Sequence, residues 1–467
     1  MAKTKIVCTI GPSSESPDVI RKMIEKGMSV ARLNFSHGSH EKHGEVIRTI
    51  RQISDELQKP VAILQDLCGP KIRVGKLPEE GIRLETGDIF TLTNEALEYG
   101  DQDKVSVSYK NLPLEVNEGD TILLADGMLE LLVKSATRSE IVCKVVIGGI
   151  LTSHKGINLP FGTLRTDAVT DKDIEDLLFG IDNEVDFIAL SFVRSAADIL
   201  KVKNIIAKEK KHTPVIAKIE KHEAISHIDE IMQVSDGIMV ARGDLGVEIP
   251  LEKVPVIQKF LVKKANNLGK PVIIATQMLR SMVNSPRPTR AEATDVANAV
   301  LDGTDAIMLS EETASGEYPV EAVEYMTKVA EEAEVKFPHE KYLKLLPEKS
   351  IADSVCYASC ILADHLEAAI VATTRSGFTA MQISRFRPKP KIIALSPEKR
   401  TVRRLALYWG CIPSIVAEHK DTDEMIAKTA EYALQTGELS KGELAVLTAG
   451  HPVWSSGTTN MLRVINL

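Results

Sequence analysis

The 467-residue sequence lacks long apolar segments and has no excess of positive charge. No apolar run approaches the ~20 residues that a membrane-spanning helix needs. Its 57 Lys and Arg residues against 65 Asp and Glu residues give a formal net charge of −8. No overall basic field is therefore available to attract nucleic acid or a membrane surface. We expect neither partner, and any phosphorylated ligand must be attracted locally.

Paired cysteines, tandem repeats and a secretory signal are also missing. The six cysteines contain no Cys-x-x-Cys pair and stand at positions 8, 68, 143, 356, 360 and 411. Cys356 and Cys360 lie four apart in an expected helix, but nothing ligand-like completes a metal site there. We expect small packed side chains instead. The N-terminal residues are typical of a strand and contain no secretory h-region, so we expect a reduced, cytoplasmic protein.

Apolar runs of strand length recur with amphipathic segments between them. The expected strands cover residues 5–10, 29–34, 60–66, 185–193, 214–219, 235–241, 271–278 and 305–310. Eight such units predict an α/β fold whose centre is a closed (β/α)8 TIM barrel. We assign residues 1–70 and 168–340 to this catalytic domain.

The repeating pattern is interrupted once, between residues 71 and 167. Short alternating runs separated by turn signals such as Glu118-Gly-Asp predict a small inserted all-β domain, a β-barrel, after the third barrel strand. From residue 341 to 467 a second series of helices and strands predicts a C-terminal open-sheet α/β domain. Helices are expected near 350–366, 377–386, 398–407 and 422–436, and strands near 368–373, 391–395, 411–416 and 443–448.

Residues 214–250 carry the densest pattern of functional side chains. Lys218 and Glu220 are two positions apart, so on a strand they point to the same face. Arg242 and Asp244 repeat that spacing after the next apolar run. Two carboxylates, a lysine and an arginine on neighbouring strand ends suit a divalent cation and a phosphorylated anion. A short helix expected at Asp244 can also turn free N–H groups toward an anion.

Other expected strands end in polar residues too. They are Arg32, Asn34, Ser36 and His37; Gln65 and Asp66; Thr276 and Gln277; and Ser310 to Thr313. Each pattern alone has an ordinary explanation, such as an exposed ion pair of little energetic value or a capped turn. Charged groups at the ends of several buried strands are costly unless they meet ligands or partners. Because active sites of TIM barrels lie at the C-terminal strand ends, these residues together predict a catalytic site.

Eight short motifs follow one another along the chain. They occupy residues 9–12 (TIGP), 31–38 (ARLNFSHG), 69–70 (GP), 153–160 (SHKGINLP), 216–220 (IAKIE), 239–246 (MVARGDLG), 275–279 (ATQML) and 286–292 (PRPTRAE). In their order, and with the inserted β segment, they resemble the pyruvate kinase family over nearly the whole chain. The combination is highly specific, although each motif alone is weak.

The resemblance implies phosphoryl transfer from phosphoenolpyruvate to ADP, giving ATP and pyruvate in the last step of glycolysis. It places Mg2+, with Mn2+ as an alternative, at Glu220 and Asp244. It places Lys218 and Arg32 beside the transferring phosphoryl group. The implied site also has the substrate carboxylate at the N–H groups of Gly243 and Asp244, and Thr276 in a proton relay.

The resemblance further implies a nucleotide side formed by Pro12, Asn34, His37, Arg73 and Lys155. Because Lys155 belongs to the inserted domain, that domain is expected to close over the site as a lid. Family members are usually homotetramers, and we expect the same here. Arg242, without a place at the substrate, is expected to hold its loop by pairing with a neighbouring carboxylate.

Several positions depart from the family pattern. Many members bind K+ at Asn, Ser, Asp and Thr positions beside a glutamate. Here Asn34, Ser36 and Asp66 are present, but Leu67 and Lys71 replace the threonine and the glutamate. A fixed ammonium at Lys71 can supply the charge that K+ brings, so we predict that K+ is not required. The alternative is a solvated surface lysine. Cys68 and Glu311 also depart, with no physical role that we can assign.

The C-terminal domain carries its own candidate ligand site. A strand followed by hydroxyl, cationic and glycine residues at a helix start suits a phosphate group, here Thr373, Thr374, Arg375, Ser376, Gly377 and Thr379. The segment resembles the family's sugar-phosphate effector loop, and residues 449–459 resemble its covering loop. We predict activation by a phosphorylated metabolite. A simple helix cap is the alternative.

Two other functions would use part of this pattern. A barrel lyase or aldolase acting on a pyruvate enolate would use the same metal pair and an arginine, but it would need neither Lys155 nor a nucleotide side. A catalytically inactive metabolite sensor would use only the C-terminal site. The complete set of catalytic candidates argues against the sensor.

Overall fold

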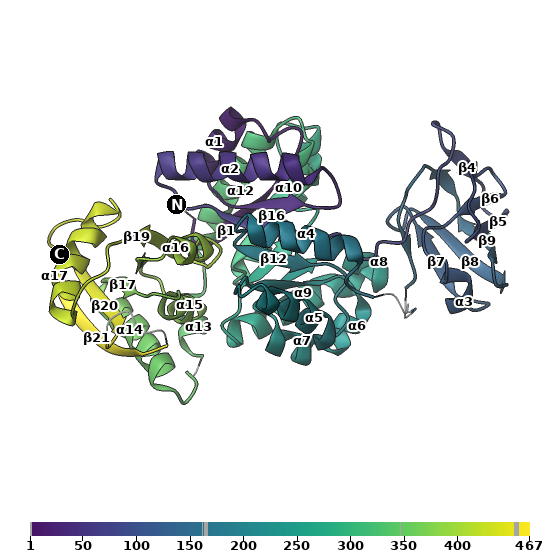
Figure 1. Ribbon diagram of the computed structural model, residues 1–467. Helices are drawn as coiled ribbons and strands as arrows, with labels where there is room; N and C mark the ends of the chain where they lie inside the picture. The colour runs from purple at the N-terminus through teal and green to yellow at the C-terminus, as the bar shows by residue number, and fades with distance from the viewer. Residues whose placement is uncertain (1, 161, 163–166, 346, 453–456) are drawn as a thin grey trace.

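The protein consists of three parts arranged in a row, with a barrel in the middle (Figure 1). The computed structural model describes residues 2–160, 162, 167–345, 347–452 and 457–467. The inserted domain stands away from one end of the barrel, and the C-terminal domain packs against the opposite end (Figure 1). Among the described residues, every helix is too short or too polar to cross a lipid bilayer.

The central domain is a closed barrel of eight parallel strands. Their order around the barrel is β1-β16-β15-β14-β13-β12-β3-β2. The strands are β1 (Lys5–Ile10), β2 (Met28–Asn34), β3 (Ala62–Asp66), β12 (Phe187–Leu190), β13 (Val215–Ile219), β14 (Gly237–Ala241), β15 (Val272–Ala275) and β16 (Ala306–Leu309). All eight predicted strands are confirmed. They are predominantly apolar, because helices cover their outer face and packed side chains fill the interior.

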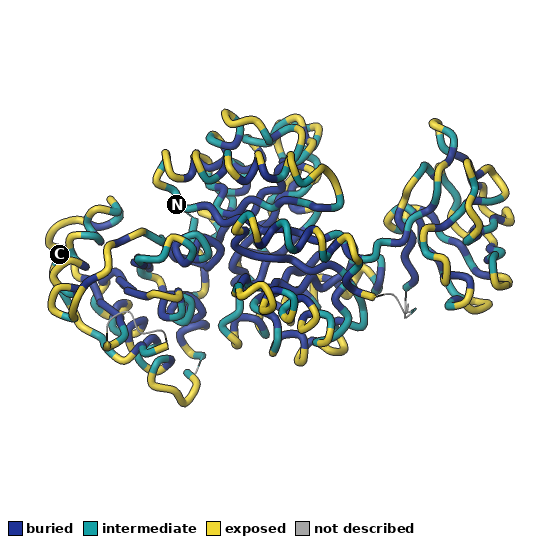
Figure 2. The backbone as a smooth tube through the Cα atoms, viewed as in Figure 1, coloured by how far each residue is buried: buried dark blue, intermediate teal, exposed yellow. Residues whose placement is uncertain are grey.

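Helices surround the barrel and bury their apolar faces on it (Figure 2). They are α1 (Pro17–Lys26), α2 (His40–Leu57), α4 (Asp171–Asp182), α5 (Ala196–Lys208), α6 (His222–Ser226), α7 (Ile228–Val234), α8 (Arg242–Glu248), α9 (Val254–Asn267), α10 (Arg290–Leu301), α11 (Glu311–Ala314) and α12 (Pro319–Glu334), with the 3-10 turns η1 (Leu251–Lys253) and η2 (Arg280–Val283). The short α13 (His339–Leu343) follows them and lies beside the C-terminal domain (Figure 1). A capping box formed by Thr170 and Asp173 begins α4. Helix α8 begins at Arg242, two residues before the predicted start.

The inserted domain has an apolar core of its own, formed around Phe90 and Leu131. Its elements are β4 (Ile82–Leu84), β5 (Ile89–Thr93), β6 (Lys104–Ser106), α3 (Leu112–Glu115), β7 (Thr121–Leu124), β8 (Leu129–Ala136), β9 (Glu140–Ile147), β10 (Gly149–Leu151) and β11 (Ile157–Asn158). The strands form a six-stranded and a two-stranded sheet where a β-barrel was expected. Isolated bridges from Arg73 to Gly156, next to β11, and from Val74 to Val107, next to β6, place residues 73–74 between the two edges of the six-stranded sheet.

The C-terminal domain is the predicted open α/β sheet. Its strand order is β19-β18-β17-β20-β21, and only β21 runs antiparallel. The elements are α14 (Ile351–Leu366), β17 (Ala369–Thr373), α15 (Phe378–Arg385), β18 (Ile392–Ser396), α16 (Lys399–Leu405), β19 (Cys411–Ile415), α17 (Thr422–Gln435), β20 (Leu444–Gly450) and β21 (Thr459–Asn466). Cys356 and Cys360 are buried in α14 as free thiols, and burial raises the pKa of Cys356 to about 12. The predicted packing role is confirmed.

The first strand connects distant parts of the chain. β1 lies between β2 and β16 in the barrel, so it pairs with a strand about 300 positions later. The Lys5 ammonium donates a 2.7 Å hydrogen bond to the carbonyl of Cys411 in the C-terminal domain. The amide of Lys3 donates to the carboxylate of Glu334 in α12. The N-terminal segment therefore joins the barrel, its last helix and the C-terminal domain.

Candidate active site

Charged side chains from the C-terminal ends of β2, β3 and β13 meet around one buried carboxylate. Asp66, at the end of β3, lies 2.7 Å from Nε of Arg32 and 3.2 Å from Nζ of Lys218. The Lys218 ammonium also lies 2.8 Å from Oε1 of Glu220. The carboxylates of Asp66 and Glu220 are each only 2% exposed. Two cations and two carboxylates thus form one buried network at the C-terminal face of the barrel.

The network keeps its charges because each group faces one of opposite sign. Burial alone would raise the pKa of Asp66, but the charges of Lys218 and Arg32, with their hydrogen bonds, lower it overall. Burial alone would lower the pKa of Lys218, whereas Asp66 and Glu220 raise it overall. Lys218 therefore remains a fixed positive charge at neutral pH.

Glu220 and Asp244 provide carboxylates from adjacent strand ends. Glu220 accepts a 2.7 Å hydrogen bond from the Phe192 amide, and its pKa is raised by burial and by the charge of Asp244, against the effect of Lys218. Asp244 is 29% exposed. Like charges held near one another favour a cation between them. Mg2+ prefers a few carboxylate oxygens together with water and substrate oxygens. The carboxylates of Glu220 and Asp244 therefore fit a Mg2+ ion.

Thr276 lies where β15 ends, on a backbone with a φ of 69°. Its hydroxyl accepts a 2.7 Å hydrogen bond from the amide of Gly243 and donates one to the carbonyl of Ala275. The family resemblance implies that the Gly243 N–H binds a substrate carboxylate. It is paired inside the protein instead, because α8 begins at Arg242 and turns this amide toward the end of β15. A ligand can use it only if the Thr276 hydroxyl turns away.

Arg242 has the structural role expected of it. Its guanidinium lies 2.7 Å from the carboxylate of Asp295 and donates a 2.8 Å hydrogen bond to the Thr276 carbonyl. This pairing ties the start of α8 to α10 and to the end of β15. The prediction that Arg242 holds its loop through a neighbouring carboxylate is confirmed.

The residues expected on the nucleotide side lie on two domains. Pro12 and His37 are exposed on loops of the barrel, and the Asn34 side chain accepts a 3.1 Å hydrogen bond from the Ser36 amide. Arg73 donates a 3.0 Å hydrogen bond to the carbonyl of His154, beside the exposed Lys155 of the inserted domain. The inserted domain stands away from the barrel (Figure 1). The two groups would meet only if that domain moved toward the barrel.

The residues of the expected monovalent-cation region have other contacts. Asn34 caps the Ser36 amide, and the Asp66 carboxylate faces Arg32 and Lys218. The Leu67 side chain is fully buried and has no oxygen to offer. Lys71 lies 4.0 Å from both Asp126 and Asp244, at the edge of the inserted domain. The ammonium therefore faces Asp244, one of the two candidate metal-binding carboxylates.

Two further residues of the network were missed in the sequence. The Ser191 hydroxyl accepts a 2.7 Å hydrogen bond from the Lys218 ammonium and donates one to the Leu67 carbonyl. The Thr9 hydroxyl accepts a 2.9 Å hydrogen bond from the Arg32 guanidinium. They belong to the first and fourth barrel strands, the two for which no polar residue had been named. A lone hydroxyl within or just after an apolar run was the available signal.

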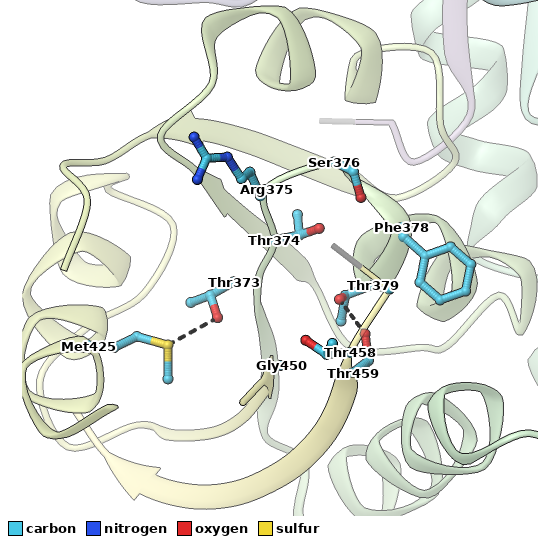
Figure 3. A pocket seen from close by; sticks show the side chains of 11 residues that line it. Thr373, Thr374, Arg375, Ser376, Phe378, Thr379, Met425, Gly450, Thr458 and Thr459 are labelled. Atoms are coloured by element: carbon cyan, nitrogen blue, oxygen red, sulfur yellow. Dashed lines mark hydrogen bonds between the residues drawn. The ribbon is translucent and has the colours of Figure 1, made fainter. Parts of the chain in front are cut away.

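Five of the six C-terminal candidate residues, all but Gly377, line one recess (Figure 3). Hydroxyl groups of Thr374, Thr379 and Thr459 surround it, and Thr379 and Thr459 are hydrogen-bonded to each other at 2.7 Å. The Arg375 guanidinium turns outward and lies 3.2 Å from both Glu398 and Glu418. Part of the expected covering loop, residues 453–456, lies outside the described residues.

The comparisons with known proteins agree with this architecture. Residues 1–323 match the pyruvate kinase barrel domain, and residues 353–465 match the pyruvate kinase alpha/beta domain. The chain is 45% identical to a pyruvate kinase of Clostridium acetobutylicum, with 99% of both chains covered. It is 48% identical to a pyruvate kinase of Staphylococcus haemolyticus, with 99% of this chain and 80% of that one covered. With its barrel, its C-terminal sheet and these full-length similarities, the chain belongs to the pyruvate kinase family of phosphotransferases.

Proposed function

We propose that the buried network at the barrel face carries out the pyruvate kinase reaction, with phosphoenolpyruvate as donor and ADP as acceptor. The observation that supports it most directly is the Lys218 ammonium, 11% exposed and held between Asp66 and Glu220. A desolvated, permanently charged group of this kind is suited to negative charge that develops on a transferring phosphoryl group. Arg32 provides a second such charge, oriented by Asp66 and Thr9.

The substrate would lie beside Glu220, Asp244 and Thr276. One Mg2+ held by Glu220 and Asp244 would neutralise charge on the substrate oxygens, and Mn2+ has the same oxygen-ligand chemistry. The Asp244 amide and, once released from Thr276, the Gly243 amide would bind the substrate carboxylate. The Thr276 hydroxyl would pass a proton, through water, to the methylene carbon of the product enolate. A threonine hydroxyl is too weak an acid to act without such a relay.

The acceptor would be bound by residues of both domains. Arg73 and Lys155 would neutralise the phosphates of ADP from the inserted domain, while Pro12, Asn34 and His37 would line the nucleotide on the barrel. Movement of the inserted domain toward the barrel would bring the two groups together and exclude water from the transferring group. A lid of this kind protects the phosphoryl group from hydrolysis.

Two finer properties complete the proposal. K+ is not required, because the Lys71 ammonium lies near Asp244 and Leu67 removes one oxygen ligand. A phosphorylated metabolite bound at the hydroxyl-rich recess of the C-terminal domain activates the enzyme. The working form is a cytoplasmic homotetramer.

One assay tests the central assignment. Pyruvate and ATP formation from phosphoenolpyruvate and ADP with Mg2+ is compared between the wild type, Lys218→Gln and the exposed control Lys208→Gln. We expect kcat of Lys218→Gln to fall by at least about 10³-fold, because a preorganised charge at the transition state is lost. Lys208, at the exposed end of α5, should be replaceable without effect. A Lys218→Gln enzyme with wild-type kcat would exclude this role for the ammonium.

A further inference from the structure

A histidine and two glutamates meet where α6 begins and α8 ends. His222 and Glu223 are the first two residues of α6, and Glu248 is the last residue of α8. Nδ1 of His222 lies 3.2 Å from Oε2 of Glu223 and 3.6 Å from Oε2 of Glu248. Both helices lie on the side of the barrel that faces the inserted domain (Figure 1). The three ligand atoms all lie within 4.8 Å of one another. In the described part of the chain, no other group of three or more His, Cys, Asp or Glu residues brings its ligand atoms within that distance.

The Glu248 side chain has one satisfied oxygen and one that is not. It is only 1% exposed. Its Oε1 accepts hydrogen bonds from the Lys221 ammonium at 2.6 Å and from the Asn158 amide at 3.3 Å. Its Oε2 is buried, has no hydrogen-bond donor among the described residues, and faces His222 and Glu223.

Glu223 presents the same problem. Its Oε2 is also buried without a hydrogen-bond donor in the described residues, and its side chain is only 12% exposed. Removing a carboxylate oxygen from water without giving it a partner is costly. Two such oxygens directed at one point, beside an imidazole nitrogen, call for a bound cation. Lys221 does not supply it, because its ammonium contacts the other oxygen of Glu248.

We propose that Nδ1 of His222, Oε2 of Glu223 and Oε2 of Glu248 bind one divalent transition-metal ion of the Zn2+ class. Ligands about 2.1 Å from a tetrahedral ion lie roughly 3.4 Å apart, and the two measured separations bracket this value. An imidazole with two carboxylates suits Zn2+, Co2+ or Mn2+, whereas Mg2+ and Ca2+ take oxygen ligands throughout. Three protein ligands leave a fourth position for water.

The site is separate from the carboxylate pair assigned to Mg2+. The oxygens of Glu220 face the Lys218 ammonium and the Phe192 amide, not His222. The proposed ion would instead stabilise the junction of the inserted domain, because Glu248 is hydrogen-bonded to Asn158 of β11. An ion on Oε2 would hold Glu248 in the position from which Oε1 contacts the inserted domain.

Binding of Co2+ to the full-length protein, in a large excess of Mg2+, tests the proposal without reference to activity. We expect one Co2+ per chain, with the visible absorption of a His-coordinated ion, and displacement by Zn2+. His222→Ala and Glu223→Gln should each weaken Co2+ binding at least about tenfold, the loss that even an outer-shell substitution causes. His365→Ala, which removes an exposed histidine of α14, should bind as the wild type does.

Asp244→Asn separates this site from the catalytic one. It should retain the Co2+ spectrum, because Asp244 is not among the proposed ligands. Unchanged Co2+ binding in both His222→Ala and Glu223→Gln would overturn the proposal, and so would absence of Co2+ binding when Mg2+ is present. Loss of binding in Asp244→Asn alone would assign the ion to the catalytic carboxylates and overturn it too. Near-ultraviolet circular dichroism of each variant shows that the fold is retained.

Discussion

The amide of Gly243 donates a 2.7 Å hydrogen bond to the hydroxyl of Thr276. This bond joins the start of α8 to the end of β15, so one residue that would bind substrate is held by another that would deliver a proton. Substrate binding at the Gly243 amide, as proposed, would therefore be coupled to the orientation of the hydroxyl. A carboxylate that accepted the Gly243 N–H would release the Thr276 hydroxyl for another partner.

Replacing Thr276 tests the proton relay. Thr276→Val keeps the branched shape, which matters at a φ of 69°, but it removes the hydroxyl. We expect kcat to fall about 10²-fold, the lower range for acid–base catalysis. The unpaired Gly243 amide should also lower the free energy of unfolding by about 1–3 kcal/mol. Steady-state kinetics and urea unfolding measure both. Thr276→Ser restores the hydroxyl and should recover most of kcat; wild-type kcat in Thr276→Val would exclude the relay.

Asp66→Asn should destabilise the protein in a pH-dependent manner. The pKa of Asp66 is lowered in the folded state, so its ionised form adds stability above the unfolded pKa of about 3.9. That contribution is lost as pH falls through the folded pKa. At pH 7, the loss of the Asp66 carboxylate beside Arg32 and Lys218 should lower the free energy of unfolding by about 3–5 kcal/mol. Urea unfolding measures the free energy of unfolding of both proteins. The difference between Asp66→Asn and the wild type should become smaller only below pH ~4.

The matched control for Asp66 is Asp167→Asn. The Asp167 side chain is 87% exposed and lies 3.7 Å from Lys201, so its replacement should change the unfolding midpoint little at any pH. A destabilisation of Asp66→Asn that stays constant from pH 7 down to pH ~3 would contradict the assigned ionisation.

Lys155→Ala tests the lid. The side chain is exposed, so its removal should leave the unfolding temperature unchanged. It should raise KM for ADP at least about tenfold and lower kcat, because the charge that pairs with nucleotide phosphates is lost. Lys144→Ala removes another exposed lysine of the inserted domain and should behave like the wild type. Equal kinetics for the two variants would exclude a nucleotide contact from Lys155.

Lys71→Glu should create a need for a monovalent cation. The new carboxylate would lie close to both Asp126 and Asp244, which are each 4.0 Å from the present ammonium. Repulsion among three carboxylates is relieved by a cation. We expect wild-type activity in Tris-chloride to change less than about twofold on adding KCl, and that of Lys71→Glu to rise at least about tenfold. Strong KCl stimulation of the wild type would contradict the prediction.

Arg375→Ala should remove the response to a phosphorylated activator. Candidate metabolites are screened for a decrease in the phosphoenolpyruvate concentration at half-saturation, and the variant should lose that decrease while keeping its basal kcat. The loss of the ion pairs of Arg375 with Glu398 and Glu418 should lower the free energy of unfolding by less than about 1 kcal/mol, because these pairs are exposed. Lys399→Ala, on the neighbouring α16, is the control. A screen without any effect on the wild type would contradict activation from this recess.

The strands were predictable because buried parallel strands are largely apolar runs. Two of them end three residues earlier than their composition indicates. The run 271–278 forms a strand only to Ala275, since Thr276 and Gln277 adopt positive φ, and the run 185–193 ends at Leu190, before Phe192 with a φ of 54°. Backbone turns of this kind are set by the contacts of the strand end, and residue type does not reveal them.

The candidate site was predictable to the extent that its residues follow strands. Lys218, Glu220 and Arg32 share that position, and the barrel brings them together around Asp66. The pairing of the Gly243 amide and the roles of Thr9 and Ser191 depend on distances between strands that no local pattern contains. The group formed by His222 and Glu248 could not be foreseen either, because α6 and α8 are joined only by the fold.

The placement of β1 has a consequence for how the chain becomes folded during synthesis. β1 leaves the ribosome before the other barrel strands, yet its neighbour β16 ends only at Leu309, and Cys411, whose carbonyl accepts a hydrogen bond from Lys5, is synthesised later still. Until β16 has been synthesised, one edge of β1 has no strand to pair with. The inserted domain contains all of its own core and can be complete long before the barrel closes. The nascent chain would therefore carry a finished lid on an open, unfinished sheet, and this is the stage at which it is most exposed to aggregation.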